Sequence, residues 1–138
     1  MTHLKISIVL IVSLLAACTM QPEKSLEDEL IGNWHIEMIK DKPVVDFSAA
    51  SLRFNADGTL SGNASCNSLS SSYTVDGSNI SLAEGAVTRK LCLGALMEQE
   101  SRMLAALQDV RSARIENGML YLKGDGGELI YKAAPSIK

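Results

Sequence analysis

Four short turn signals divide the chain and restrict its fold more than any other feature. They are Asp57-Gly58, Asp76-Gly77, Asn117-Gly118 and Asp125-Gly126-Gly127, and apolar and polar residues alternate between them. Such pairs are typical of β-hairpins, because glycine accepts the positive φ angles that tight hairpin turns require. The chain is therefore predicted to form antiparallel hairpins, with Asp57-Gly58 as a two-residue turn.

The alternating segments are the expected strands. They cover Trp34–Met38, Leu52–Ala56, Leu60–Cys66, Tyr73–Val75, Ile80–Ala83, Ala113–Glu116, Met119–Lys123 and Glu128–Lys132. The intervening run Asn67–Ser72 is rich in serine and asparagine, which favours a loop. Gly62 falls inside an expected strand, where glycine indicates a bulge or a close approach of two backbones.

One segment, about residues 95–110, has the periodicity of a helix. Its expected apolar face carries Leu96, Met97, Met103, Leu104, Leu107 and Val110, and its expected polar face carries Glu98, Gln99, Glu100, Ser101 and Arg102. Glu98 and Arg102 have the i, i+4 spacing of an ion pair. One helix among antiparallel strands indicates the α+β class. A sheet this long in a small domain is expected to curl into a barrel-like form of about seven to nine strands, because curling hides its edges.

The N-terminus has the pattern of an export signal. Lys5 precedes the apolar run Ile6–Leu15, and Leu15-Ala16-Ala17-Cys18 matches the lipobox of bacterial lipoproteins. The match implies a lipoprotein signal peptide at 1–17 and acylation of Cys18; an ordinary signal peptide with an incidental cysteine is the alternative. We expect a flexible lipid-anchored tether at 18–29, one domain at 30–133 and a tail at 134–138.

Two cysteines, Cys66 and Cys92, remain once Cys18 carries lipid. In an exported domain two thiols tend to pair, because the compartment is oxidising. A disulfide between Cys66 and Cys92 is the expectation, and two buried free thiols remain the alternative.

The charged and catalytic residue types exclude several function classes. Without residues 1–17 the chain has 12 basic and 16 acidic groups, a net charge of −4, so no nucleic-acid partner is expected. His35 is the only histidine after the leader, and its spacing from Cys66 and Cys92 matches no zinc pattern. The chain also lacks Cys-x-x-Cys. We therefore expect no catalytic residue, metal or cofactor, and place His35 on the solvated face of its strand.

A polar surface is the candidate for recognition. Asn63, Asn67 and Tyr73 lie around the serine run Ser68–Ser72 and are the candidate binding residues. The alternative is a solvated loop whose short side chains bond to nearby backbone groups.

The order of these segments resembles the META domain family, which includes the HslJ-type heat-inducible lipoproteins of bacteria. The resemblance spans about Leu30–Lys132 and rests on Gly32–Trp34, Leu52–Gly58, Ser61-Gly62 with Cys66-Asn67, Tyr73, Thr88 with Cys92, Glu100, Leu120–Leu122 and Leu129–Tyr131. It implies an antiparallel sheet with one helix and a role in the cell envelope. No catalytic residues are established for the family, so none are carried over.

Together these features predict a lipid-anchored, non-enzymatic envelope protein that supports envelope integrity and tolerance of heat or novobiocin. Its expected partners are the membrane, through Cys18, and an envelope protein, and we expect a monomer. Thr19 is not the aspartate that retains lipoproteins at the inner membrane, so in a host with two membranes the outer one, facing the periplasm, is expected. The alternative is a binding module, a carrier of a small ligand or an inhibitor of an exported enzyme.

Overall fold

The computed structural model describes residues 22–136. The predicted signal peptide 1–17, the lipidation site Cys18 and residues 137–138 of the tail lie outside this range. The described chain runs through α1 (Leu26–Leu30), β1 (Gly32–Ile39), β2 (Lys42–Pro43), β3 (Ser51–Phe54), β4 (Thr59–Asn63), β5 (Ser68–Asp76), β6 (Asn79–Leu82), β7 (Ala86–Val87), α2 (Gly94–Leu107), β8 (Ser112–Glu116), β9 (Met119–Lys123) and β10 (Leu129–Pro135).

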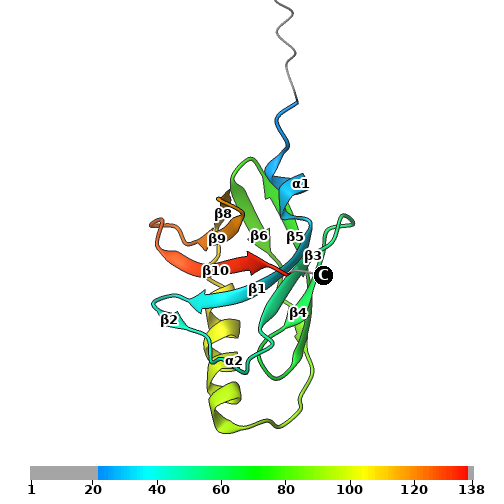
Figure 1. The fold of residues 1–138 in the computed structure, drawn as a ribbon. Helices are drawn as coiled ribbons and strands as arrows, with labels where there is room; N and C mark the ends of the chain where they lie inside the picture. The colour runs from blue at the N-terminus through cyan, green and yellow to red at the C-terminus, as the bar shows by residue number, and fades with distance from the viewer. Residues whose placement is uncertain (1–21, 137–138) are drawn as a thin grey trace, which may run out of the picture.

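The strands form one antiparallel sheet that closes on itself. Pairing runs in the order β10-β9-β8-β6-β5-β4-β3-β1, and β1 pairs back to β10. The result is an eight-stranded barrel, to which β2 and β7 are added along β1 and β5. Helix α1 lies at the end of the barrel where the N-terminal segment enters, and α2 lies at the opposite end (Figure 1). The predicted α+β class with a curled antiparallel sheet is confirmed.

The turns follow the local chemistry of their residues. Asn117 and Gly118 both have positive φ, 51° and 75°, and join β8 to β9 with Glu116 opposite Met119. The turn at Asp57-Gly58 is one residue longer than predicted, because the hydrogen bond from the Asn55 N–H to the Thr59 carbonyl encloses three residues, 56–58.

A bulge in β1 changes the predicted alternation. Trp34 and Ile36 are buried as expected, but Glu37 is an extra residue in the pairing with β10. Beyond the bulge the inward position passes to Ile39, and Met38 is only half-buried. Bulges shift the faces of a strand in this way, since two residues oppose one on the partner.

The ordered domain extends beyond the predicted boundaries at both ends. Residues 26–29, expected in the tether, belong to α1, where the Ser25 side chain accepts a hydrogen bond from the Asp28 N–H as an N-cap. Leu30 is fully buried, and its carbonyl accepts a 2.8 Å bond from the Trp34 indole. At the other end β10 continues to Pro135, beyond the predicted limit at 133.

The prediction of a loop at Asn67–Ser72 was wrong, because β5 begins at Ser68. Leu69 and Tyr73 point into the barrel, and the serines between them lie in a strand whose register with β4 is unbroken. The small, polar residues of this segment are typical of a turn. The segment forms a strand because Leu69 and Tyr73 are buried in the barrel.

Helix α2 closes its end of the barrel with apolar side chains. Met103 and Ala106 are fully buried, and Leu107 is nearly so. Tyr131 lies on β10 and is fully buried, and its hydroxyl donates a hydrogen bond to the Met103 carbonyl. Burial raises the pKa of the Tyr131 hydroxyl, so it remains a donor to the helix at all ordinary pH values.

Gly62 lies where the backbones of β3 and β4 approach closely, one of the two predicted alternatives. A Cβ atom at this position would lie 2.1 Å from the Ser51 carbonyl oxygen on β3. We expect Gly62→Ala to lower the free energy of unfolding by about 1–3 kcal/mol, because β3 and β4 must move apart. Urea denaturation measures the change. Gly94→Ala is the matched control: nothing lies within 4 Å of its Cβ position, so little or no loss is expected, and equal losses in both variants would contradict the steric argument.

Candidate functional site

A disulfide joins Cys66, after β4, to Cys92, just before α2, with their Cα atoms 6.0 Å apart. The predicted pairing is present in the structure. Cys66 is buried and Cys92 is exposed. The bond therefore ties an exposed loop, Thr88–Leu93, hereafter the 88–93 loop, to the wall of the barrel.

Asn67, a predicted binding residue, is instead the centre of a buried network that holds this loop. Its side-chain oxygen accepts hydrogen bonds from the Lys90 N–H (2.6 Å) and the Thr88 hydroxyl (2.9 Å). Its amide donates to the Lys90 carbonyl (3.2 Å) and to the Glu100 carboxylate (2.9 Å). Only 2% of Asn67 is exposed, so it acts by fixing the loop.

The other two predicted binding residues also direct polar groups into the fold. Tyr73 is buried, packs edge-on against Phe54 with ring centroids 5.0 Å apart, and donates its hydroxyl to the Asn55 carbonyl. Burial is the main cause that raises the pKa of the Tyr73 hydroxyl. Asn63 accepts a hydrogen bond from the Ser65 N–H at 2.8 Å. The three residues do not form one exposed surface.

Glu100 was placed on the polar face of the helix, but it is buried. Its carboxylate accepts from the Cys66 N–H (3.2 Å), the Asn67 N–H (2.6 Å) and the Asn67 side-chain amide (2.9 Å). These contacts connect α2 to the segment that carries the disulfide. The burial of Glu100 could have been inferred from helical spacing. Glu100 is three residues before Met103 and seven before Leu107, which places it on the same, buried face of α2.

Gln99, beside Glu100, is also buried and bonds to a different segment. Its side-chain oxygen accepts from the Val45 N–H at 2.7 Å, and its amide donates to the hydroxyls of Ser48 (2.6 Å) and Ser65 (3.0 Å). Of the predicted apolar face, Met103, Leu107 and Val110 are buried, whereas Leu96, Met97 and Leu104 are half-buried. The buried face of α2 is therefore partly polar.

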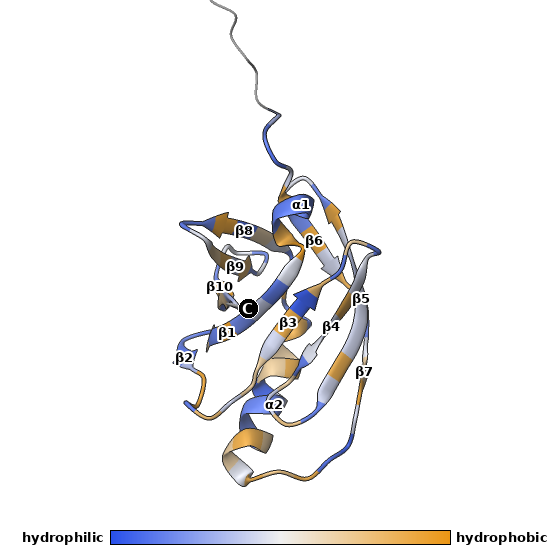
Figure 2. Ribbon diagram, turned by 45° about the vertical axis from the view of Figure 1, so that its right-hand side comes forward, coloured by the Kyte–Doolittle hydropathy of each residue, from blue (hydrophilic) through white to orange (hydrophobic). Residues whose placement is uncertain are grey.

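The 88–93 loop presents two leucines to solvent. Leu91 is 93% exposed and Leu93 is 70% exposed, and we call this pair the apolar tip. Arg89 and Lys90 precede it and are also exposed. Figure 2 shows the hydrophobic segment at the α2 end of the molecule, opposite α1. A firmly held loop with exposed leucines is suited to contact with another molecule, because little ordering is needed on binding.

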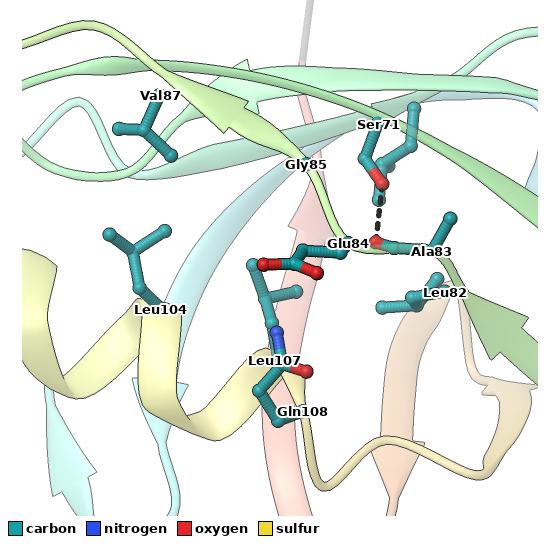
Figure 3. Close-up of a pocket in the computed structure, with 10 residues that line it drawn as sticks. Ser71, Leu82, Ala83, Glu84, Gly85, Val87, Leu104, Leu107 and Gln108 are labelled. Carbon is teal, nitrogen blue, oxygen red and sulfur yellow. Dashed lines mark hydrogen bonds between the residues drawn. The ribbon is translucent and has the colours of Figure 1, made fainter.

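A pocket of about 210 Å³ lies between the second half of α2 and the β5–β6–β7 side of the barrel (Figure 3). Leu60, Leu82, Leu104 and Leu107 give it apolar walls, and Ser71, Glu84 and Gln108 supply polar side chains. Its size and lining suit a small amphipathic molecule.

Other predicted positions are surface features. His35 is exposed on β1, as expected. Within residues 22–136 the expected Glu98–Arg102 ion pair is not formed, and no group of three His, Cys, Asp or Glu side chains could hold a metal. Lys40 and Asp109 form an exposed pair at 2.8 Å that raises the pKa of Lys40 and lowers that of Asp109. None of the helices described here could cross a membrane.

Two solved structures have a fold similar to that of this chain. The structure is similar to an NMR structure of a protein from Burkholderia xenovorans, with a TM-score of 0.68, 17% identity, and coverage of 81% of this chain and 87% of the other. It is also similar to the crystal structure of a DUF4847 family protein from Bacteroides vulgatus, with a TM-score of 0.60, 13% identity, and coverage of 81% and 97%. At these identities the similarity shows the fold alone.

No curated protein matches the sequence significantly. The model of the META domain family matches residues 26–136, which contain the closed barrel, both helices and the disulfide. This segment is a complete folding unit, since it has its own core and closes its own sheet. The chain belongs to the META domain family.

Proposed function

We propose that the chain is a lipid-anchored protein of the cell envelope, and that its META domain supports envelope integrity under heat or novobiocin stress through non-enzymatic contacts. The lipobox Leu15–Cys18 supports the anchor. A disulfide between Cys66 and Cys92 is in keeping with an oxidising compartment outside the cytoplasm. The residue after Cys18 is Thr19 and not the aspartate that retains lipoproteins at the inner membrane, which favours anchoring in the outer membrane if the host has two membranes.

The position of the apolar tip carries this proposal. The N-terminal segment enters the domain beside α1, and the 88–93 loop lies at the opposite end (Figure 1). A flexible tether of this length would reach only about 15 Å on average, so a domain anchored at Cys18 would hold Leu91 and Leu93 away from its membrane. The exposed leucines would then meet another component of the envelope, with Arg89 and Lys90 favouring an acidic partner.

The bonding of the chemically reactive side chains supports a non-enzymatic role. Both sulfurs of Cys66 and Cys92 are in the disulfide, so neither provides a thiolate for His35 to activate. Glu100 and Asn67 direct their polar groups to the backbone and to each other. These residues hold the loop in place, and contact through the loop is the function that their arrangement favours.

The anchor is tested by replacing Cys18 with alanine or by treating cells with globomycin. We expect the protein to leave the membrane fraction in the Cys18→Ala strain and to accumulate as the longer precursor with globomycin. Unchanged partition and unchanged size would refute lipid anchoring.

The contact role is tested in a strain that lacks the chromosomal gene and grows at raised temperature or with novobiocin. The wild-type protein is expected to restore growth, and Leu91→Ser/Leu93→Ser is expected to fail at equal protein levels. Ile31→Ser is the matched control, because Ile31 is also exposed (42%) but lies at the α1 end. Full rescue by the double variant would rule out the apolar tip as the contact surface.

The pocket in Figure 3 favours a second candidate, a carrier of a small ligand. Its leucine walls would take an alkyl group, and the Glu84 carboxylate would take a cation, so short alkyl amines are the class to test. Butylamine titrated against the protein should shift the NMR signals of Leu104 and Leu107 saturably, and Glu84→Gln should abolish the effect. The absence of saturable shifts would count against this candidate.

A further inference from the structure

A second pocket, of about 200 Å³, lies between α2 and the hairpin of β1 and β2. Figure 1 shows where these elements pass one another. We call this second pocket the Arg102 pocket. It is lined by Ile39, Lys40, Asp41, Lys42, Arg102, Ala105 and Ala106. It shares no residue with the pocket in Figure 3 or with the 88–93 loop, so it is independent of the function proposed above.

Arg102 is unusual among the side chains of residues 22–136. Its Nε atom is the only buried side-chain nitrogen or oxygen there that has no hydrogen-bond partner. An N–H group removed from water without a partner costs about 1–3 kcal/mol, and more when the group is charged. Native structures rarely keep such a group unless a ligand, an ion or an ordered water completes it. The Arg102 side chain also lines the pocket, so a ligand bound there would lie beside the guanidinium that carries this donor.

The net charge of the groups that line the pocket favours a ligand with one negative charge. Lys40 is already bonded to Asp109 at 2.8 Å, and the Glu128 and Asp41 charges also act on it. Of the remaining lining groups, Arg102 and Lys42 are cationic and Asp41 is anionic. The surplus is one positive charge, which suits a monoanion better than a dianion such as phosphate.

The size and the walls of the pocket limit the ligand further. A liquid water molecule takes about 30 Å³, so the pocket holds on the order of six or seven non-hydrogen atoms. Ile39, Ala105 and Ala106 supply apolar walls. A guanidinium presents a planar pair of N–H donors that matches the two oxygens of a carboxylate. We propose that the Arg102 pocket binds a small aliphatic monocarboxylate, with the carboxylate on Arg102 and the alkyl group against Ile39 and Ala105.

Butyrate has six non-hydrogen atoms and is the probe that tests this proposal. Residues 19–138, which contain the complete folding unit, are labelled with ¹⁵N and titrated with sodium butyrate at constant ionic strength. We expect saturable shifts of the Arg102 Nε–Hε signal and of the Ala105 and Ala106 amide signals. Butanol, which has the same alkyl group and no charge, should give no saturable shift.

Variants of Arg102 show whether the guanidinium binds the probe. Arg102→Gln should weaken butyrate binding by about 10-fold to 100-fold, the equivalent of one charged hydrogen bond. Arg102→Lys keeps the charge but not the planar pair of donors, and should bind with intermediate affinity. Arg114→Gln, on the exposed face of β8, is the matched control and should bind as the wild type does.

Three results would overturn the proposal. The first is no saturable shift with butyrate, which would mean that ordered water satisfies Arg102. The second is equal binding by Arg102→Gln and the wild type. The third is phosphate binding as tight as butyrate binding, which would indicate a simple anion site. If Arg102→Gln fails to fold, as judged by its circular dichroism, Arg102→Lys and the butanol comparison still decide the question.

Discussion

Replacing Glu100 with alanine is expected to lower the free energy of unfolding by roughly 3–5 kcal/mol, because three buried donors lose their acceptor at about 1–3 kcal/mol each. The donors are the N–H groups of Cys66 and Asn67 and the Asn67 side-chain amide. A domain of this size is stable by only about 5–15 kcal/mol, so the loss is a large fraction of the total. Urea denaturation followed by tryptophan fluorescence measures it, since Trp34 is the only tryptophan.

Two further variants separate the hydrogen bonds of Glu100 from the loss of a side chain. Glu98→Ala removes an exposed carboxylate from the same helix, and its effect should stay within about 0.5 kcal/mol. Glu100→Gln keeps the shape but brings an NH₂ group against the Asn67 amide, so an intermediate loss is expected. A loss below about 1 kcal/mol for Glu100→Ala would show that water or a local rearrangement satisfies the three donors.

The same network determines how firmly the apolar tip is held. Asn67 bonds to both Glu100 and the backbone of Lys90, so loosening Asn67 releases the chain just before Leu91. Under the proposed contact function, Glu100→Ala would therefore weaken partner binding even at temperatures where the domain stays folded.

Local chemistry explains why the hairpins were predictable. Asn117-Gly118 needs two positive φ angles and almost no support from the rest of the fold. Closure of the sheet was predicted on general grounds, because exposed edges are avoided. The register shift at Glu37 was not predictable, since it arises from pairing with β10, about a hundred residues further along the chain.

The buried polar residues of α2 were missed for a related reason. Gln99 and Glu100 are polar, and polar residues are exposed by default. Their partners, Val45, Cys66 and Asn67, lie more than thirty residues away in the sequence. Only the closed fold brings those backbone N–H groups to the helix. The position of Glu100 on the Met103 face was a usable signal, but its burial depended on donors that no local pattern indicates.

The second large effect is expected from removing the disulfide. Cys66→Ser/Cys92→Ser should lower the free energy of unfolding by about 3–4 kcal/mol in the chain-entropy model, because the bond closes a loop with a sequence separation of 26. In that model the loss arises because the unfolded chain gains freedom, whichever contacts the folded state keeps. Urea denaturation of the double variant, and of the wild type with and without reductant, measures the change.

Combining this variant with Glu100→Ala distinguishes an effect on the unfolded chain from an effect on the loop. If the disulfide acts only through the unfolded chain, the two losses should add to within about 0.5 kcal/mol. If it also positions the Cys66 N–H for Glu100, a coupling of more than about 0.5 kcal/mol is expected, because neither constraint keeps its full effect without the other. We expect coupling, since Cys66 takes part in both contacts. Simple additivity would show that Glu100 and Asn67 hold the 88–93 loop without help from the disulfide.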